Sequence, residues 1–180
     1  MPNRLTYRYI SLIISFFFFL LSGNTLAGLL IEPDPDWKES EHTLPPPPLP
    51  ENLKAFEVNV TSPNQYLVDL NSISIGTDTV VRYTLVIQTP SGARNVTYEG
   101  IRCQTKERQL YATARADGTW IPVKKTAWQP FSNSAYHRPA VTLAEDFFCD
   151  GNAPPHDQAE ILRHFNGIFD HTDPTRGIRP

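Results

Sequence analysis

The sequence lacks the short motifs that mark catalytic and metal sites. It contains no Gly-x-Ser-x-Gly elbow and no Ser-x-x-Lys pair, which leaves nucleophilic catalysis without a candidate. Its five histidines never recur as His-x-His or His-x-x-x-His, the spacings that place two metal ligands on one element. Asp157, Glu160 and His164 could share a helix face, but charges at this spacing are common on solvated helices. We therefore expect no catalytic residue, no metal and no cofactor.

A hydrophobic run long enough to cross a membrane is also missing. The longest apolar stretch, Ile10 to Leu21, is about two thirds of the ~20 residues that a stable transmembrane helix needs. Arg4 and Arg8 precede this stretch, and small and polar residues that end in Ala27 follow it. This arrangement is typical of a secretory signal peptide, which we assign to residues 1–27.

Cleavage between Ala27 and Gly28 would release the protein into the periplasm. A bacterial lipoprotein signal has cysteine where Leu29 stands, so this chain lacks the thiol that takes the lipid. We expect no stable membrane insertion once the signal is removed. The alternative is an inner-membrane tether, in which residues 10–22 are retained and the prolines that follow act as a spacer.

Basic residues are not in excess. The chain has 16 Lys and Arg against 19 Asp and Glu, and the predicted signal peptide removes two arginines and no acid. The remaining 14 basic and 19 acidic side chains give a formal charge of −5. This balance argues against a nucleic-acid partner and against an anionic membrane surface.

Cysteine occurs only twice, at Cys103 and Cys149. An exported chain with two cysteines usually joins them, and a bridge across a loop of this length contributes about 4 kcal/mol in the chain-entropy model. Redox-active pairs lie closer together, as in Cys-x-x-Cys. We expect a structural disulfide.

Composition divides the rest of the chain into four parts. Residues 28–52 are rich in proline and predict a linker, extended as polyproline II over its second half. The string "PPPPLP" could instead be the ligand of an aromatic-lined groove, and Trp37 could pack back onto the domain. Residues 53–150 should form a β-rich domain, residues 151–169 a C-terminal helix and residues 170–180 a disordered tail.

Short β-rich runs follow one another at close intervals, a spacing typical of an antiparallel sheet built from hairpins. The predicted strands span 56–60, 66–70, 80–88, 95–104, 109–116 and 120–123. One face of the third strand should be buried and the other more polar, because Val81, Tyr83, Leu85 and Ile87 alternate with Arg82, Thr84, Val86 and Gln88. We expect a single α+β domain, mainly an antiparallel sheet of about six strands with the C-terminal helix packed on it.

The fourth strand changes its hydrophobic phase at Gly100. Val96 and Tyr98 occupy even positions, whereas Ile101 and Cys103 occupy odd ones. A one-residue shift with glycine at the break predicts a β-bulge. Such a bulge either curves the sheet around its core or re-aims neighbouring side chains. The side chains that it would display together are Tyr98, Glu99 and Arg102.

A hairpin is predicted around Asp117 and Gly118, which suit a two-residue type I′ turn. In that register Arg115 opposes Trp120 and can lie over its ring, a contact worth about 0.5 to 1 kcal/mol at an exposed site. The pair would stabilise the sheet, although exposed Trp and Arg are also enriched at interfaces.

Two segments after the hairpin point to a covering layer. The string "LAEDFFC", residues 143–149, fits either a last strand or a short helix that covers the sheet. Pro154 and Pro155 favour the start of a helix. Its apolar stripe should dock on the domain or on a partner, and consists of Ile161, Leu162, Phe165, Ile168 and Phe169.

The strings "VVRYTLVIQTPSGARNVTYEGIRC", "ERQLYATARADGTW" and "FFC" resemble the cryptic-neisserial-protein-like (CNP1-like) family of exported Gram-negative bacterial proteins. The likeness runs from about Trp37 to Cys149 and does not support the helix from His156 onward. Membership implies an envelope protein, and it implies no known activity, substrate or cofactor. Leu29 is a departure from the family, whose members are often suspected to be lipoproteins.

We expect a non-catalytic periplasmic protein that binds an unknown protein or envelope component. If the candidate side chains cluster on the outside, they would form the contact site, namely Tyr98, Glu99, Arg102, Arg115 and Trp120. The alternative from another class is a periplasmic hydrolase that uses Glu99 with Asp69 or Asp117. It requires two carboxylates within about 10 Å of each other in a concave pocket.

Overall fold

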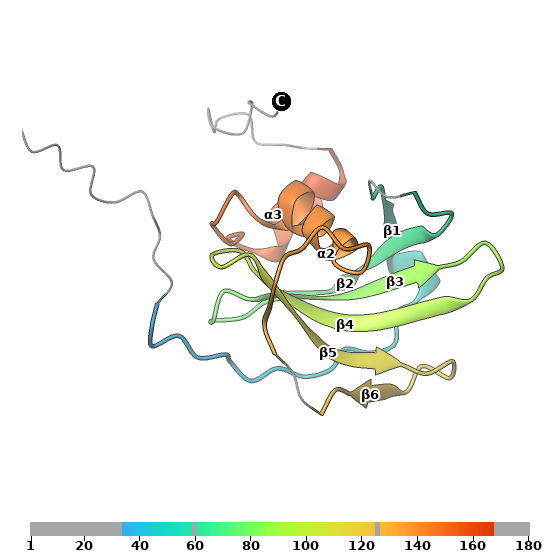
Figure 1. Ribbon diagram of the computed structural model, residues 1–180, viewed down its shortest axis with the longest axis horizontal. Coiled ribbons are helices and arrows are strands. Elements are labelled where there is room, and N and C mark those ends of the chain that lie inside the picture. The colour runs from blue at the N-terminus through green and yellow to red at the C-terminus, as the bar shows by residue number, and fades with distance from the viewer. Residues whose placement is uncertain (1–33, 59–60, 125–126, 168–180) are drawn as a thin grey trace, which may run out of the picture. The chain divides into compact units, whose positions relative to one another are not determined.

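The computed structural model describes residues 34–58, 61–124 and 127–167 (Figure 1). The predicted signal peptide, the retained-tether segment and the C-terminal tail lie outside the described residues. An antiparallel sheet dominates the described part. Its strands are β1 (Leu53–Phe56), β2 (Gln65–Ile75), β3 (Val81–Gln88), β4 (Arg94–Arg102), β5 (Glu107–Ala114), β6 (Trp120–Pro122) and β7 (Gln129–Pro130).

The sheet is a meander in which each strand from β1 to β6 pairs with the next one along the chain. The short β7 pairs with β5 at Glu107 and Arg108, at the opposite end of β5 from the β6 pairing. Period-2 alternation and turn residues are local signals, so this topology could be predicted, and the expectation of a single α+β domain is confirmed.

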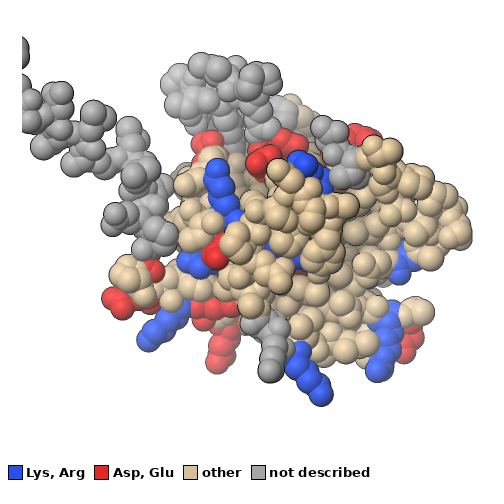
Figure 2. All heavy atoms as spheres, viewed as in Figure 1, with Lys and Arg blue, Asp and Glu red and all other residues tan. Residues whose placement is uncertain are grey.

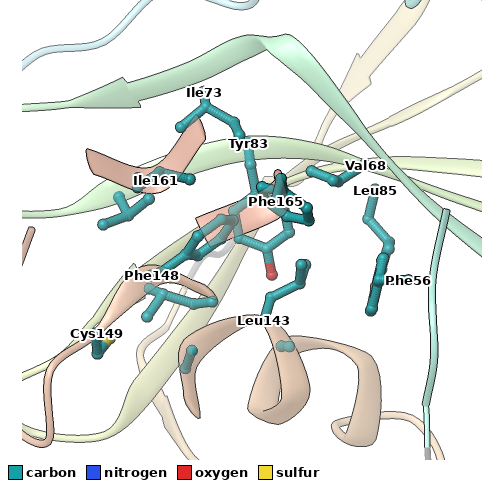
Figure 3. Close-up of a cluster of buried hydrophobic side chains, with 14 of the residues drawn as sticks. Phe56, Val68, Ile73, Tyr83, Leu85, Leu143, Phe148, Cys149, Ile161 and Phe165 are labelled. Atoms are coloured by element: carbon teal, nitrogen blue, oxygen red, sulfur yellow. The ribbon is translucent and has the colours of Figure 1, made fainter. Parts of the chain in front are cut away.

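Helices cover one face of the sheet. They are α2 (Arg138–Leu143), the π-helical turn η2 (Ala144–Phe148) and α3 (Gln158–Phe165). The string "LAEDFFC" is therefore helical, and it delivers Phe148 into the core. Figure 3 shows this core between the helices and the sheet, with Tyr83, Phe148 and Phe165 at its centre. The rings of Tyr83 and Phe148 meet edge to face, with centroids 5.2 Å apart.

The C-terminal helix α3 begins after Asp157, whose carboxylate accepts a hydrogen bond from the backbone N–H of Glu160. This is an N-cap, which satisfies one of the free N–H groups of the first turn. Ile161 and Phe165 are buried, so the described part of the apolar stripe docks on the domain. Ile168 and Phe169 lie outside the described residues.

The predicted disulfide between Cys103 and Cys149 is confirmed. Cys103 follows the end of β4, and Cys149 follows η2. The bridge therefore fastens the helical layer to the centre of the sheet.

The second face of the sheet carries the more polar side chains, as the alternation in β3 predicts, but this face is buried as well. Arg82, Thr84 and Val86 are all buried. Residues 34–49, which we call the strap, cross this face on the side away from α2 and α3 (Figure 1). The strap continues into η1 (Pro50–Asn52) and then β1. The described part of the proline-rich segment is thus extended and in contact with the sheet.

The predicted bulge at Gly100 is wrong. Strand β4 pairs with β3 in unbroken register from Arg94 to Ile101. The irregularity lies in the pairing of β4 with β5, where Tyr111 is the extra residue. The phase change arises because both faces of β4 are buried, one under the strap and the other under the helices. Glycine is required at position 100 because a Cβ there would meet the Tyr111 hydroxyl oxygen at 2.5 Å.

The predicted hairpin register is also wrong by one residue. Trp120 pairs with Ala114, and the backbone N–H of Arg115 donates to the carbonyl of Thr119. Only Gly118 of the turn has positive φ, at +83°, so the loop has three residues with glycine in the left-handed position. Because neighbouring residues in a strand point to opposite faces, Arg115 does not lie over Trp120.

Candidate functional site

Two of the predicted binding residues meet on the strap side of the sheet. The rings of Tyr98 and Trp120 lie 6.2 Å apart, and the Trp120 indole N–H donates to the carbonyl of Pro45 at 2.7 Å. The His42 ring of the strap also contacts Tyr98. Tyr98 is 2% exposed, so the condition of a shared outer surface is not met. The chain's own proline-rich strap occupies this aromatic face.

Arg102 lies on the same face and Arg115 does not. The Arg102 guanidinium stacks 3.6 Å from the ring centroid of Trp37 and forms an ion pair with Glu107 at 3.1 Å. Arg115 is exposed on the β5–β6 turn. The structure therefore assigns Arg102 to anchoring the strap and separates it from Arg115.

The Glu39 carboxylate is one of the groups that anchor the strap to the sheet. It accepts hydrogen bonds from the Tyr111 hydroxyl at 2.6 Å, the Gln109 amide at 3.1 Å and the Trp128 indole at 3.3 Å. Arg82 adds an ion pair at 3.3 Å. Burial, and then the hydrogen bond to Glu39, raise the pKa of Tyr111 well above its usual range.

Arg82 and Asp78 form a buried ion pair beneath the strap, with an N–O distance of 2.6 Å. Burial opposes the charge of Asp78. Hydrogen bonds from the Arg82 side chain and from the backbone N–H groups of Ser40 and Val80 outweigh this effect and lower the pKa of Asp78 to about 2. Asp78 also accepts the Trp37 indole N–H at its backbone carbonyl. These polar groups fasten the strap.

Glu99 faces the other side of the sheet, toward the helices. Its carboxylate forms a two-pronged ion pair with Arg108, at 2.9 and 3.3 Å. It also accepts hydrogen bonds from the hydroxyls of Tyr83 and Thr97, at 3.0 and 2.8 Å. Burial, and then the nearby Glu99 charge, raise the pKa of Tyr83 well above its usual range. Both carboxylate oxygens are therefore fully engaged.

The geometry does not support the carboxylate pairs of the hydrolase hypothesis. Asp69 is in register with Thr84 and Tyr98, so it shares their face, and Glu99 points to the opposite one. Asp117 lies in the exposed β5–β6 turn, where it accepts the backbone N–H of Thr119. Neither acid shares a pocket with Glu99.

A cavity of about 320 Å³ opens beside Tyr136 on the helix side, at the ends of β2, β3 and β4. We call it the Tyr136 cavity. Its apolar floor consists of Tyr66, Leu85 and Ile87. Its polar wall consists of Thr61, Ser62, Asn64, Asn95, Thr97 and Glu99, and its rim includes Ala135 and Tyr136.

The rim of the cavity is held by hydrogen bonds. Tyr136 is 59% exposed, and its ring centroid lies 4.5 Å from the Arg108 guanidinium carbon. The His137 imidazole bridges Ser132 and Gln129, at 3.0 and 3.3 Å. The cavity therefore has the Tyr136 ring at its rim and the Glu99–Arg108 ion pair, in which the two charges balance, at its base.

The distribution of surface charge on this face does not indicate a particular class of partner. Figure 2 shows basic and acidic side chains interspersed over the face drawn, without a broad area of one sign.

Among the described residues no group of three His, Cys, Asp or Glu side chains is placed to hold a metal. Within the same residues, no helix has the length and hydropathy of a membrane span.

Sequence reasoning singled out Glu99 but missed the rest of the cavity. Asn95, Thr97 and Glu99 alternate along β4, which was a usable signal that they share a face. Asn64 and Tyr136 lie in irregular segments, where side chains follow no helical or strand periodicity. Their approach to β4 depends on the fold, so no local pattern marks them.

The fold defines an α+β domain with one antiparallel sheet, a helical layer on one face and an N-terminal strap on the other. The CNP1-like family model matches residues 32–166, and the chain belongs to this family. The match includes both the strap and α3. No curated protein and no solved structure matches the chain.

Proposed function

We propose that this protein is an exported, non-catalytic binding protein of the bacterial cell envelope, and that the Tyr136 cavity is its binding site. The observation that carries the proposal is the lining of this cavity, in which an apolar floor lies beside polar side chains that are uncharged except for Glu99, and Glu99 is paired with Arg108. Pockets of about this volume and chemistry are the usual binding sites of small ligands and anchoring side chains.

The state of Glu99 supports a role without catalysis. A general acid or base must exchange a proton with its substrate. The Glu99 carboxylate instead forms an ion pair with Arg108 and accepts hydrogen bonds from two hydroxyl groups, those of Tyr83 and Thr97. It serves to hold the base of the cavity.

Export is supported by two features of the chain. Residues 1–27 have the pattern of a signal peptide, and the Cys103–Cys149 bridge is of the kind that persists in oxidising compartments. The native protein should have an intact mass that starts at Gly28. A mass that includes residues 10–22 would reject this part of the proposal.

The binding site is tested by photocrosslinking in an envelope fraction. A benzoyl-phenylalanine replaces Tyr136 at the rim in one variant and the exposed Ile121 on β6 in another. We expect a crosslinked product at position 136 that is lost when Ala135→Trp fills the cavity. The matched control is Asn133→Trp, an exposed position in the same segment that does not line the cavity. Equal crosslinking in the filled and control variants would refute the site.

A further inference from the structure

The polar wall of the Tyr136 cavity has a defined pattern of donors and acceptors. The Thr97 hydroxyl donates to Glu99 at 2.8 Å, so toward the cavity it can only accept. The side-chain amides of Asn64 and Asn95 each present a donor and an acceptor, and neither makes a hydrogen bond within the described residues. The wall therefore favours a ligand that has both hydrogen-bond donors and hydrogen-bond acceptors.

Formal charge on the ligand is disfavoured. The cavity contains one ionised group, Glu99, and its charge is balanced by Arg108. Arg108 is itself buried and has the Tyr136 ring against it. A charged ligand group placed against this buried base would lose hydration without gaining an opposite charge.

The floor requires an apolar group next to these polar ones. Leu85 and Ile87 lie two residues apart on β3, and Tyr66 is in register with Ile87 on β2. All three belong to or pack against the main hydrophobic core. An aliphatic side chain placed on this floor would extend the core outward and bury further apolar area.

We propose that the Tyr136 cavity takes a short segment of a partner polypeptide, with one aliphatic side chain on the floor and the adjoining peptide groups on the wall. This inference rests on the proposed function of the cavity. A peptide N–H meets the Thr97 acceptor, and the donor and acceptor of a peptide group match an asparagine amide. A peptide is uncharged and supplies a donor, an acceptor and an aliphatic side chain within one residue.

The test uses N-acetyl-leucine N-methylamide, an uncharged single residue with a peptide group on each side. It is titrated into the isotopically labelled full chain and followed by NMR. We expect chemical shift changes that centre on Asn95 and Thr97. N-acetyl-leucine methyl ester lacks the second N–H and should bind about tenfold more weakly, because a site built around a hydrogen bond discriminates against the analogue that lacks it.

Two variants and one alternative ligand complete the test. Asn95→Ala should weaken the amide five- to tenfold, whereas Asn71→Ala, an exposed asparagine on β2 outside the cavity, should leave it unchanged. Equal binding of ester and amide, or no shift in the cavity, overturns the peptide assignment. Shifts with N-acetylglucosamine but not with the amide overturn it in favour of a saccharide.

Failure of this inference is distinguishable from failure of the proposed function. If Ala135→Trp abolishes crosslinking from position 136 but N-acetyl-leucine N-methylamide does not bind, the cavity is a binding site for another ligand class. If crosslinking is insensitive to Ala135→Trp, the site itself is wrong.

Discussion

At the scale of single residues, the most consequential feature is the buried pair of Glu99 and Arg108. Arg108 is 2% exposed and Glu99 is 3% exposed, so both charges have left water. A buried ion pair adds little net stability, but removal of one partner leaves an uncompensated charge in a low-dielectric interior. The pair therefore stabilises the base of the Tyr136 cavity only as long as both members are present.

Replacement of Glu99 by alanine should lower the free energy of unfolding by about 3 to 5 kcal/mol, because Arg108 would remain buried and unpaired. The double variant Glu99→Leu/Arg108→Met should regain most of this loss. Urea unfolding followed by circular dichroism measures both. A single variant that loses no more than about 1 kcal/mol would contradict the interpretation, since losses of that size are typical of exposed pairs.

At the scale of elements, the strap is part of the domain. It contributes the Glu39 carboxylate, which joins β3 and β5 to the segment after β6 through Arg82, Tyr111 and Trp128. It also places prolines against the β5–β6 hairpin, where Trp120 donates to the carbonyl of Pro45. Recognition of an extended proline-rich segment by an aromatic surface here occurs within one chain.

Replacement of Glu39 by alanine should lower the free energy of unfolding by about 2 to 4 kcal/mol, because several donors lose a charged acceptor at once. Lys38→Ala is the matched control, since Lys38 is exposed and adjacent on the strap, and its effect should stay within about 0.5 kcal/mol. Near-ultraviolet circular dichroism should report the loosened Trp37 and Trp128 rings. Equal stabilities of the two variants would show that the strap is not anchored at Glu39.

At the scale of the whole molecule, the sheet is the common support of two different layers. The helical layer joins it through the hydrophobic core and the Cys103–Cys149 bridge. The strap joins it through ion pairs, hydrogen bonds and aromatic contacts. The central strands are buried on both faces as a consequence.

Removal of the disulfide should lower the free energy of unfolding by about 4 kcal/mol, because a loop of 46 residues is no longer closed in the unfolded chain. The comparison is between the oxidised protein and the Cys103→Ala/Cys149→Ala variant in urea. The variant should keep the strand signals of the sheet, since no strand pairing depends on the bridge. A loss below about 1 kcal/mol would mean that the bridge does not constrain the unfolded chain.

Local hydrophobic patterns predicted most of the strands. They failed for strand β4, which is covered by the helical layer on one face and by the strap on the other. The alternation of Val81, Tyr83 and Leu85 correctly predicted the helix-facing core. The phase change around Gly100 was interpreted as a bulge, because burial on both faces produces the same pattern. The β5–β6 turn was predicted one residue too short, since Asp-Gly fits both a two-residue loop and the end of a three-residue loop.

The sequence by itself determined the antiparallel meander, the Cys103–Cys149 bridge and the membership of the CNP1-like family. Period-2 alternation, turn residues and a lone pair of cysteines are written locally along the chain. Only the tertiary structure decided that the strap docks on the sheet and that Asn64, Asn95 and Tyr136 surround one cavity. The Glu39–Tyr111 bond spans 72 residues, and contacts at such separations leave no period in a sequence.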